Sequence, residues 1–162
     1  MRKYLPHILI ISFVFLLTPT AQVATYAGAI EDAREEVRNN PDDAKAHFNL
    51  GEAYDELGKY KEAIKSYKQA IKIDPDLAIA HYKLGLAYGK SGMYEEAIES
   101  FKQAIKIDPD HAKAHYCLGV TYVNLGMHEE EIDAYKQAIR IDPDYAKAHY
   151  NLGISYRKSG KY

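Results

Sequence analysis

Histidine is the residue type whose spacing in this 162-residue sequence most directly suggests chemistry. His47, His81, His115 and His149 follow one another at a constant step of 34 residues, and imidazole is a common zinc ligand. If each histidine lies on its own helix, neighbours are at least about 8–10 Å apart, whereas zinc holds its ligands at about 2.1 Å. We therefore expect these histidines to be structural and not metal ligands.

The other candidates for chemistry are isolated. His111 lies four residues before His115, but it precedes the predicted helix and no cluster of carboxylates accompanies the pair. Cys117 is the single cysteine, which excludes an internal disulfide and a cysteine-based zinc site, and no neighbouring base would activate its thiol. Glycine-rich phosphate loops, Gly-x-Ser-x-Gly and His-Glu-x-x-His are absent from the sequence. We predict no catalytic residue, no metal site and no cofactor.

The composition is typical of a folded domain without a nucleic-acid partner. Hydrophobic residues make up 47% of the chain and charged residues 27%, and the formal net charge is -2. Binding of nucleic acid would require a clustered basic face, which this balance does not indicate.

Residues 1–28 have the layout of a secretory signal peptide. Arg2 and Lys3 precede an apolar run over residues 8–17, and small residues follow it. Cleavage is expected after Ala27 or Ala29, and the mature protein is expected to be exported, either periplasmic or secreted. The alternative is an uncleaved membrane anchor over residues 5–24, although the apolar run is about half of the ~20 residues that span a bilayer.

A nine-residue segment sets the period of the rest of the chain. Lys-Gln-Ala-Ile-Lys-Ile-Asp-Pro-Asp occupies residues 68–76, returns at 102–110, and returns with one arginine at 136–144. Proline ends a helix, so each copy predicts a helix end, and a fixed period of this size predicts stacked helical units. The expected helices cover residues 29–39, 44–56, 60–73, 78–90, 94–107, 112–124, 128–141 and 146–158. Asp42 or Asp43 is expected to cap the second of these helices.

Each unit repeats a Leu-Gly pair, a tyrosine, an alanine, an aromatic residue and a proline. In the first unit these are Leu50-Gly51, Tyr54, Ala63, Tyr67 and Pro75. The pattern resembles that of the tetratricopeptide repeat family. The resemblance implies an all-α fold, a right-handed α-solenoid of antiparallel helix pairs. It places a half-repeat helix at 29–40, three repeats at 44–77, 78–111 and 112–145, and a partial repeat at 146–162 that has only its first helix.

The resemblance also implies a function. The first helices of such repeats line a concave groove, so the chain is expected to be a non-catalytic scaffold that binds a protein or peptide of unknown identity. The expected groove residues are Lys45, Phe48, Asn49, Glu52, Tyr82, Lys83, Leu86, Lys113, Tyr116, Val120, Asn124, Tyr150, Asn151 and Ile154. A second interpretation is that the aromatic residues of this set pack between helices as part of the repeat consensus. The clamp with which some family members bind chaperone C-termini is not matched, since Glu52 and Cys117 occupy two of its positions.

The third unit departs from the pattern at two positions. His128 replaces a tyrosine, and Glu131 replaces the alanine of Ala63 and Ala97. Glutamate at this position must bend outward or be partly buried, and His128, three residues earlier, is the expected partner. The pair is either a tolerated local change or a pH-sensitive site.

The two ends of the repeat array are in matching register. In the 34-residue frame Ala27 follows Tyr162, so the last helix of one molecule is able to pair with the first helix of another. The alternative function is therefore a structural protein that self-assembles head to tail. Ala33 and Glu36, which occupy the positions of Tyr67 and Ala70, weaken this pairing. A competing explanation is that the sequence is part of a longer repeat array.

Overall fold

A computed structural model describes the backbone of residues 19–159 and the side chains of residues 28–158. Regular structure in this part of the chain is helical throughout, as predicted. The helices are α2 (Pro19–Asn39), α3 (Ala44–Glu56), α4 (Tyr60–Ile73), α5 (Ala78–Lys90), α6 (Tyr94–Ile107), α7 (Ala112–Leu125), α8 (His128–Ile141) and α9 (Ala146–Ser159).

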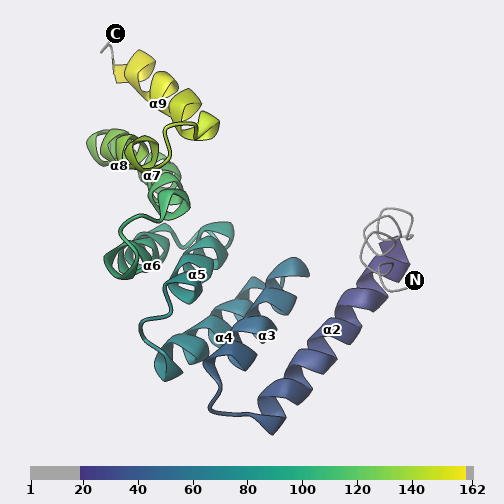
Figure 1. Cartoon of the computed structure of the whole chain (residues 1–162). Helices are drawn as coiled ribbons and strands as arrows, with labels where there is room; N and C mark the ends of the chain where they lie inside the picture. Colours follow the sequence, from purple (N-terminus) through teal and green to yellow (C-terminus); the bar gives the residue numbers. More distant parts are fainter. Residues whose placement is uncertain (1–18, 160–162) are drawn as a thin grey trace, which may run out of the picture.

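The helices form antiparallel hairpins that stack into a curved array (Figure 1). Helices α3, α5, α7 and α9 are the first helices of successive units, and α4, α6 and α8 are the second helices. Each helix packs mainly on its neighbours in the chain, and α5 also packs against α7. The first helices therefore lie on the inner side of the curve, which confirms the predicted right-handed α-solenoid.

The predicted helix limits agree with the structure at all but three positions. Helices α7 and α9 end one residue later than expected. Helix α2 begins at Pro19, ten residues before the predicted start at Ala29. A proline is tolerated in the first turn of a helix, and the following alanine-rich segment contains no further proline before Pro41. The predicted cleavage positions lie inside α2, whereas residues 1–18 of the predicted signal peptide lie outside the described residues.

A buried aromatic ring fills the interior of each hairpin. Tyr67, Phe101 and Tyr135 are almost fully buried, and each lies over a glycine of the first helix. A Cβ atom added at Gly85 would lie 2.7 Å from Cε1 of Phe101. The Leu-Gly pair of the repeat thus allows the two helices to approach closely, because any side chain there would overlap the ring.

The histidine row connects each loop to the helix that follows it. The ring Nε2 donates a hydrogen bond to a prolyl carbonyl six residues earlier in all four units. The pairs are His47–Pro41 at 2.8 Å, His81–Pro75 at 2.9 Å, His115–Pro109 at 3.1 Å and His149–Pro143 at 2.8 Å. These contacts confirm a structural role and explain why the histidine and the proline share one period.

A cation–π contact recurs where one unit meets the next. A basic side chain of the preceding helix lies over a tyrosine ring of each first helix. The pairs are Arg34–Tyr54 at 5.9 Å, Lys68–Tyr88 at 5.5 Å, Lys102–Tyr122 at 6.0 Å and Lys136–Tyr156 at 5.7 Å. Arg34 is one 34-residue step before Lys68, so α2 packs on α3 in the register of a second helix.

Candidate partner-binding groove

All fourteen predicted groove residues lie on first helices, and none of them is buried. The exposed ones are Lys45, Lys113, Asn124 and Tyr150. The half-buried ones are Phe48, Asn49, Glu52, Tyr82, Lys83, Leu86, Tyr116, Val120, Asn151 and Ile154. The structure thus places the set along one side of the array, and its role in binding stays a prediction.

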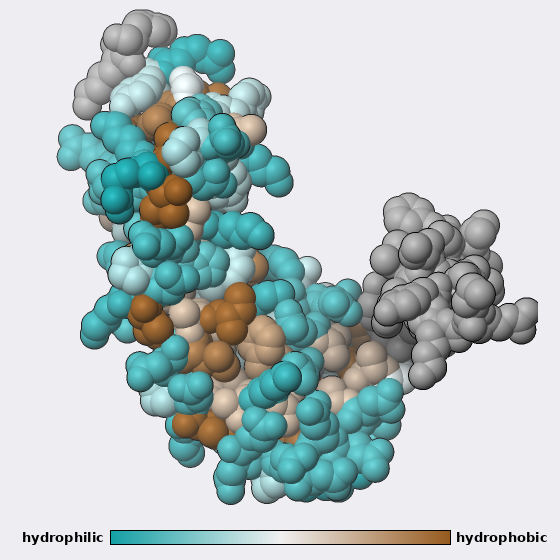
Figure 2. Space-filling model, in the orientation of Figure 1, coloured by the Kyte–Doolittle hydropathy of each residue, from teal (hydrophilic) through white to brown (hydrophobic). Residues whose placement is uncertain are grey.

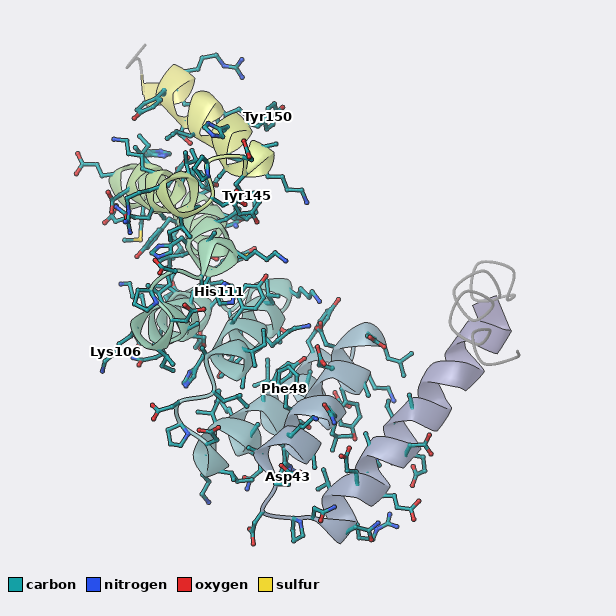
Figure 3. All side chains as sticks on the ribbon, in the orientation of Figure 1. Asp43, Phe48, Lys106, His111, Tyr145 and Tyr150 are labelled. Atoms are coloured by element: carbon teal, nitrogen blue, oxygen red, sulfur yellow. The ribbon has the colours of Figure 1, made fainter. Side chains whose placement is uncertain are left out.

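Three of the four aromatic groove residues pack against the second helix of their own unit. Phe48 lies 5.7 Å from the ring of Tyr67, and Tyr82 and Tyr116 make equivalent contacts with the second helices of their units. Tyr150 is different, because 72% of it is exposed, and it projects from α9 in Figure 3. The packing interpretation therefore holds for the first three aromatic residues, whereas Tyr150 is available to a partner.

Two residues that were not among the predicted groove residues cover this aromatic row. His111 lies 4.7 Å from the ring of Tyr82, and Tyr145 lies 5.1 Å from the ring of Tyr116. Both stand just before a first helix, at the junction between units (Figure 3). The signal in the sequence was weak, because the equivalent positions of the earlier units hold Asp43 and Leu77. Asp43 caps α3 instead, its side chain accepting a 2.9 Å bond from the Lys45 amide.

Cys117 lies within the groove but is not activated. Its Sγ is 3.9 Å from the hydroxyl of Tyr82, and burial raises the pKa of the Cys117 thiol above its ordinary value. A raised pKa disfavours the thiolate, which is the nucleophilic form. This geometry agrees with the prediction that Cys117 has no nucleophilic role.

Three slots separate successive first helices, and the first slot is closed by ion pairs. Between α3 and α5, Lys83 Nζ lies 2.6 Å from Glu52, and Lys90 Nζ lies 2.8 Å from Asp55. The two charged groove residues predicted here, Lys83 and Glu52, therefore neutralise each other. Neither charge is left to select a partner of opposite sign.

The second slot is open and largely apolar. A hollow of about 310 Å³ lies between α5 and α7, with Phe101 of α6 at its floor. Leu86, Cys117 and Val120 form its walls, and Asn124 lies at its edge. Figure 2 shows the apolar surface of the visible face as separate patches, with hydrophilic residues between them.

The third slot combines apolar walls with a buried carboxylate. Its hollow of about 320 Å³ lies between α7 and α9 and is lined by Val120, Ile154 and Asn151. Glu131 of α8 lies at the floor and is only 4% exposed. Its carboxylate accepts hydrogen bonds from the hydroxyl of Ser155 and, at 3.2 Å, from Nδ1 of His128.

The pairing of Glu131 with His128 was predicted, but that with Ser155 was missed. Ser155 occupies the position of Ala53, Ala87 and Thr121 in the earlier units. Thr121 carries a hydroxyl that donates to the Cys117 carbonyl, and no glutamate stands opposite it. A hydroxyl at this position therefore gave no specific signal for the pair with Glu131.

A third hollow belongs to the scaffold. It measures about 470 Å³, lies among α6, α7 and α8, and is lined by His115, Glu130 and other polar residues. A hollow of about 410 Å³ recurs in the same register around His47 and Glu62. Because it repeats with the units, it reflects how the units stack. Residues 28–158 also contain no group of three or more histidine, cysteine or acidic side chains able to hold a metal ion.

Comparisons with known proteins agree with this geometry. Sequence models described as TPR repeat match residues 54–92, 90–126 and 127–160, and one described as Tetratricopeptide repeat matches residues 34–65. A comparison with curated proteins found no match.

Similar solved structures include two of MamA. The crystal structure of MamA has a TM-score of 0.81 at 28% identity and covers 90% of this chain and 86% of its own. MamA 41-end from Desulfovibrio magneticus RS-1 has a TM-score of 0.78 at 26% identity and covers 84% and 77%. The first TPR of Spaghetti (RPAP3), bound to the HSP90 peptide SRMEEVD, has a TM-score of 0.70 at 22% identity, covering 72% and 93%; it supports the fold alone.

Proposed function

The chain belongs to the tetratricopeptide repeat family, and from this we propose that it is an exported, non-catalytic scaffold that binds a peptide or protein segment in the groove along α3, α5, α7 and α9. The observation that carries the proposal is the pair of open hollows in the second and third slots. Val120 and Asn124 line both hollows, so the two form a continuous surface. The RPAP3 structure is an example of a protein of this fold that is bound to a peptide.

The chemistry of these hollows favours an extended segment with large side chains. Each hollow is concave and has apolar walls. Each is also lined by an asparagine, whose side chain can hydrogen-bond to the backbone of a bound segment. Tyr150 adds an exposed aromatic ring on α9. Tyrosine supplies a large contact area at a low cost in conformational entropy.

The groove is tested by comparing two double variants of the chain. Leu86→Ser with Ile154→Ser removes apolar walls from both open hollows, whereas Glu95→Ser with Glu99→Ser changes two exposed residues of α6 and is the control. Replacement of Tyr82 or Tyr116 is less informative, because those rings also hold the units together.

The assay identifies proteins that co-purify with the exported chain and then measures the affinity of each purified partner by calorimetry. We expect at least about a tenfold loss of affinity for the groove variant, since apolar anchors dominate such interfaces, and no change for the control. Equal affinities of wild type and groove variant would refute a binding role for this groove.

Export rests on residues 1–28, whose layout is that of a signal peptide. Within the part of the chain that the structure describes, no helix is both long and apolar enough to span a membrane. Fusion of residues 1–30 to a reporter that is active only after export should give activity, and N-terminal sequencing of the product decides between cleavage after Ala27 and after Ala29. A reporter that stays inactive, or an uncleaved product in the membrane fraction, would contradict export as a mature soluble chain.

Self-assembly is the second candidate function, and charge favours it. Helix α9 carries Lys147, Arg157 and Lys158 and no acidic residue, whereas α2 carries four acidic residues and two basic ones. Opposite charges on these helices would promote association between molecules at low salt. Sedimentation over rising concentration should then show larger species that salt dissociates. A monomer at all concentrations would refute this function.

A further inference from the structure

We propose that Glu131 makes the third slot a binding subsite for a primary ammonium group, such as the side chain of a lysine in a bound segment. The subsite deepens the proposed function, because it assigns a chemical class to one position of the partner.

The carboxylate is not required by the scaffold. Ala63 and Ala97 occupy the same position in the first and second units, and both are fully buried at the junction of three helices. The third unit keeps the same backbone arrangement with a glutamate there, and its helix α8 has the same length as α4 and α6. The acidic group is therefore an addition to a position that the fold fills with a methyl group.

The carboxylate retains unused capacity for hydrogen bonds. An ionised carboxylate has about four acceptor positions, and the described contacts of Glu131 occupy two of them, through Ser155 and His128. Burial of a negative charge is costly unless a cation is close to it. His128 is the one ion-pair partner found for Glu131 among the described side chains, and two thirds of the His128 side chain is exposed. A cation that enters the hollow would complete the pairing from the opposite side.

The walls of the hollow suit an alkyl chain that ends in an ammonium group. Val120 and Ile154 present apolar surface toward the space, and Asn124 and Asn151 place side-chain amides along it. The methylene groups of a lysine would pack on the apolar walls while its three N–H groups bond to Glu131 and to an amide oxygen. Lys158 also lines the hollow, so the ligand has to displace this side chain from the mouth or pass beside it.

The arrangement predicts a spacing in the partner. Neighbouring slots are roughly 8–10 Å apart, which is the distance between packed helices, and an extended segment in the polyproline II conformation rises about 3.1 Å per residue with three residues per turn. An apolar side chain in the second slot and an ammonium group in the third slot are therefore about three residues apart. The first slot adds no such requirement, because its charges are paired with each other.

The test uses n-butylammonium, which has the atoms of a lysine side chain, and n-butanol as its uncharged counterpart. Each is titrated into the full chain while NMR follows the amide signals of Ile154 and Ser155. We expect n-butylammonium to shift these signals and to bind at least about tenfold more tightly than n-butanol, as a charge-assisted hydrogen bond predicts.

Variants of the chain assign the effect to Glu131. Glu131→Gln should abolish the preference for the ammonium, and so should Glu131→Ala, which restores the residue of the other units and is expected to fold. Glu129→Gln, which changes an exposed acid of α8, should have no effect. His128→Tyr, the residue of the first and second units, should keep or increase the affinity by removing a competing hydrogen-bond donor.

Equal binding of the two probes to the wild-type chain, or an ammonium preference that survives Glu131→Gln, would overturn the proposal. These results do not depend on a natural partner. An ammonium subsite without any groove-dependent partner would refute the proposed function alone, and a groove-dependent partner without ammonium binding at Glu131 would refute this inference alone.

Discussion

Because the two helices of a unit approach closely, the effect of a glycine-to-alanine substitution on stability can be predicted. A Cβ atom on Gly119 would lie 2.6 Å from Cε1 of Tyr135, whereas ordinary contact begins at 3.4 Å. The ring is 1% exposed, so it has no space into which to move. Overpacking of this kind costs about 1–3 kcal/mol, and the intrinsic helix preference of alanine returns about 0.5–1 kcal/mol. Gly119→Ala should therefore lower the free energy of unfolding by about 1–2 kcal/mol.

Gly153 provides the matched control for this prediction. It stands at the same position of its unit, yet a Cβ atom there would have no neighbour within 4 Å. Gly153→Ala should thus gain only the helix preference and raise the free energy of unfolding by about 0.5–1 kcal/mol. The two identical chemical changes are expected to have opposite signs.

Urea unfolding followed by circular dichroism compares the two variants with the wild-type chain. The midpoint should fall for Gly119→Ala and rise for Gly153→Ala, with slopes close to that of the wild type. Equal changes of the midpoint in the two variants would refute the claim that ring contact, and not helix preference, explains the glycine of the repeat.

Three further predictions concern single side chains. Asp43→Ala removes the cap of α3 and should lower the free energy of unfolding by about 1 kcal/mol in urea, whereas the neighbouring Asp42→Ala should not. Burial raises the pKa of Tyr135 to about 12, so the folded state keeps its proton where the unfolded state loses it. Stability should then fall as the pH rises from about 10 to 12, and Tyr135→Phe should weaken this fall; an unchanged alkaline midpoint would contradict it. Because burial also raises the pKa of Cys117, iodoacetamide should alkylate the native chain at least about tenfold more slowly than the urea-unfolded chain by mass spectrometry, and equal rates would disprove protection.

Most of the fold could be predicted because its signals are local. Asp-Pro follows each second helix and ends it. Glycines with a positive φ, such as Gly126 at 70°, lie in the turn after a first helix. The helix limits therefore follow from neighbouring residues alone. The predicted start of α2 was wrong for a related reason. The change of composition near Ala29 marks where the repeats begin, but the sequence there contains no proline that would end a helix.

The groove could be predicted only in outline, because its character depends on contacts between units. The pairing of Lys83 with Glu52 joins residues 31 positions apart, and no local pattern reveals it. The pairing of Glu131 with Ser155 is of the same kind. Position in the repeat indicates which side chains face the groove, whereas the charge of each slot depends on how two neighbouring units combine.

The restriction of packing to neighbouring helices has a consequence for how the chain folds. The most distant side-chain hydrogen bonds that the structure describes join residues 35 positions apart, as between Tyr82 and Cys117 or between Tyr116 and Asn151. No contact of that kind requires a loop much longer than one unit to close, so the entropic barrier to each step is small. Such low contact order predicts fast folding that can nucleate in any unit and spread along the array in both directions.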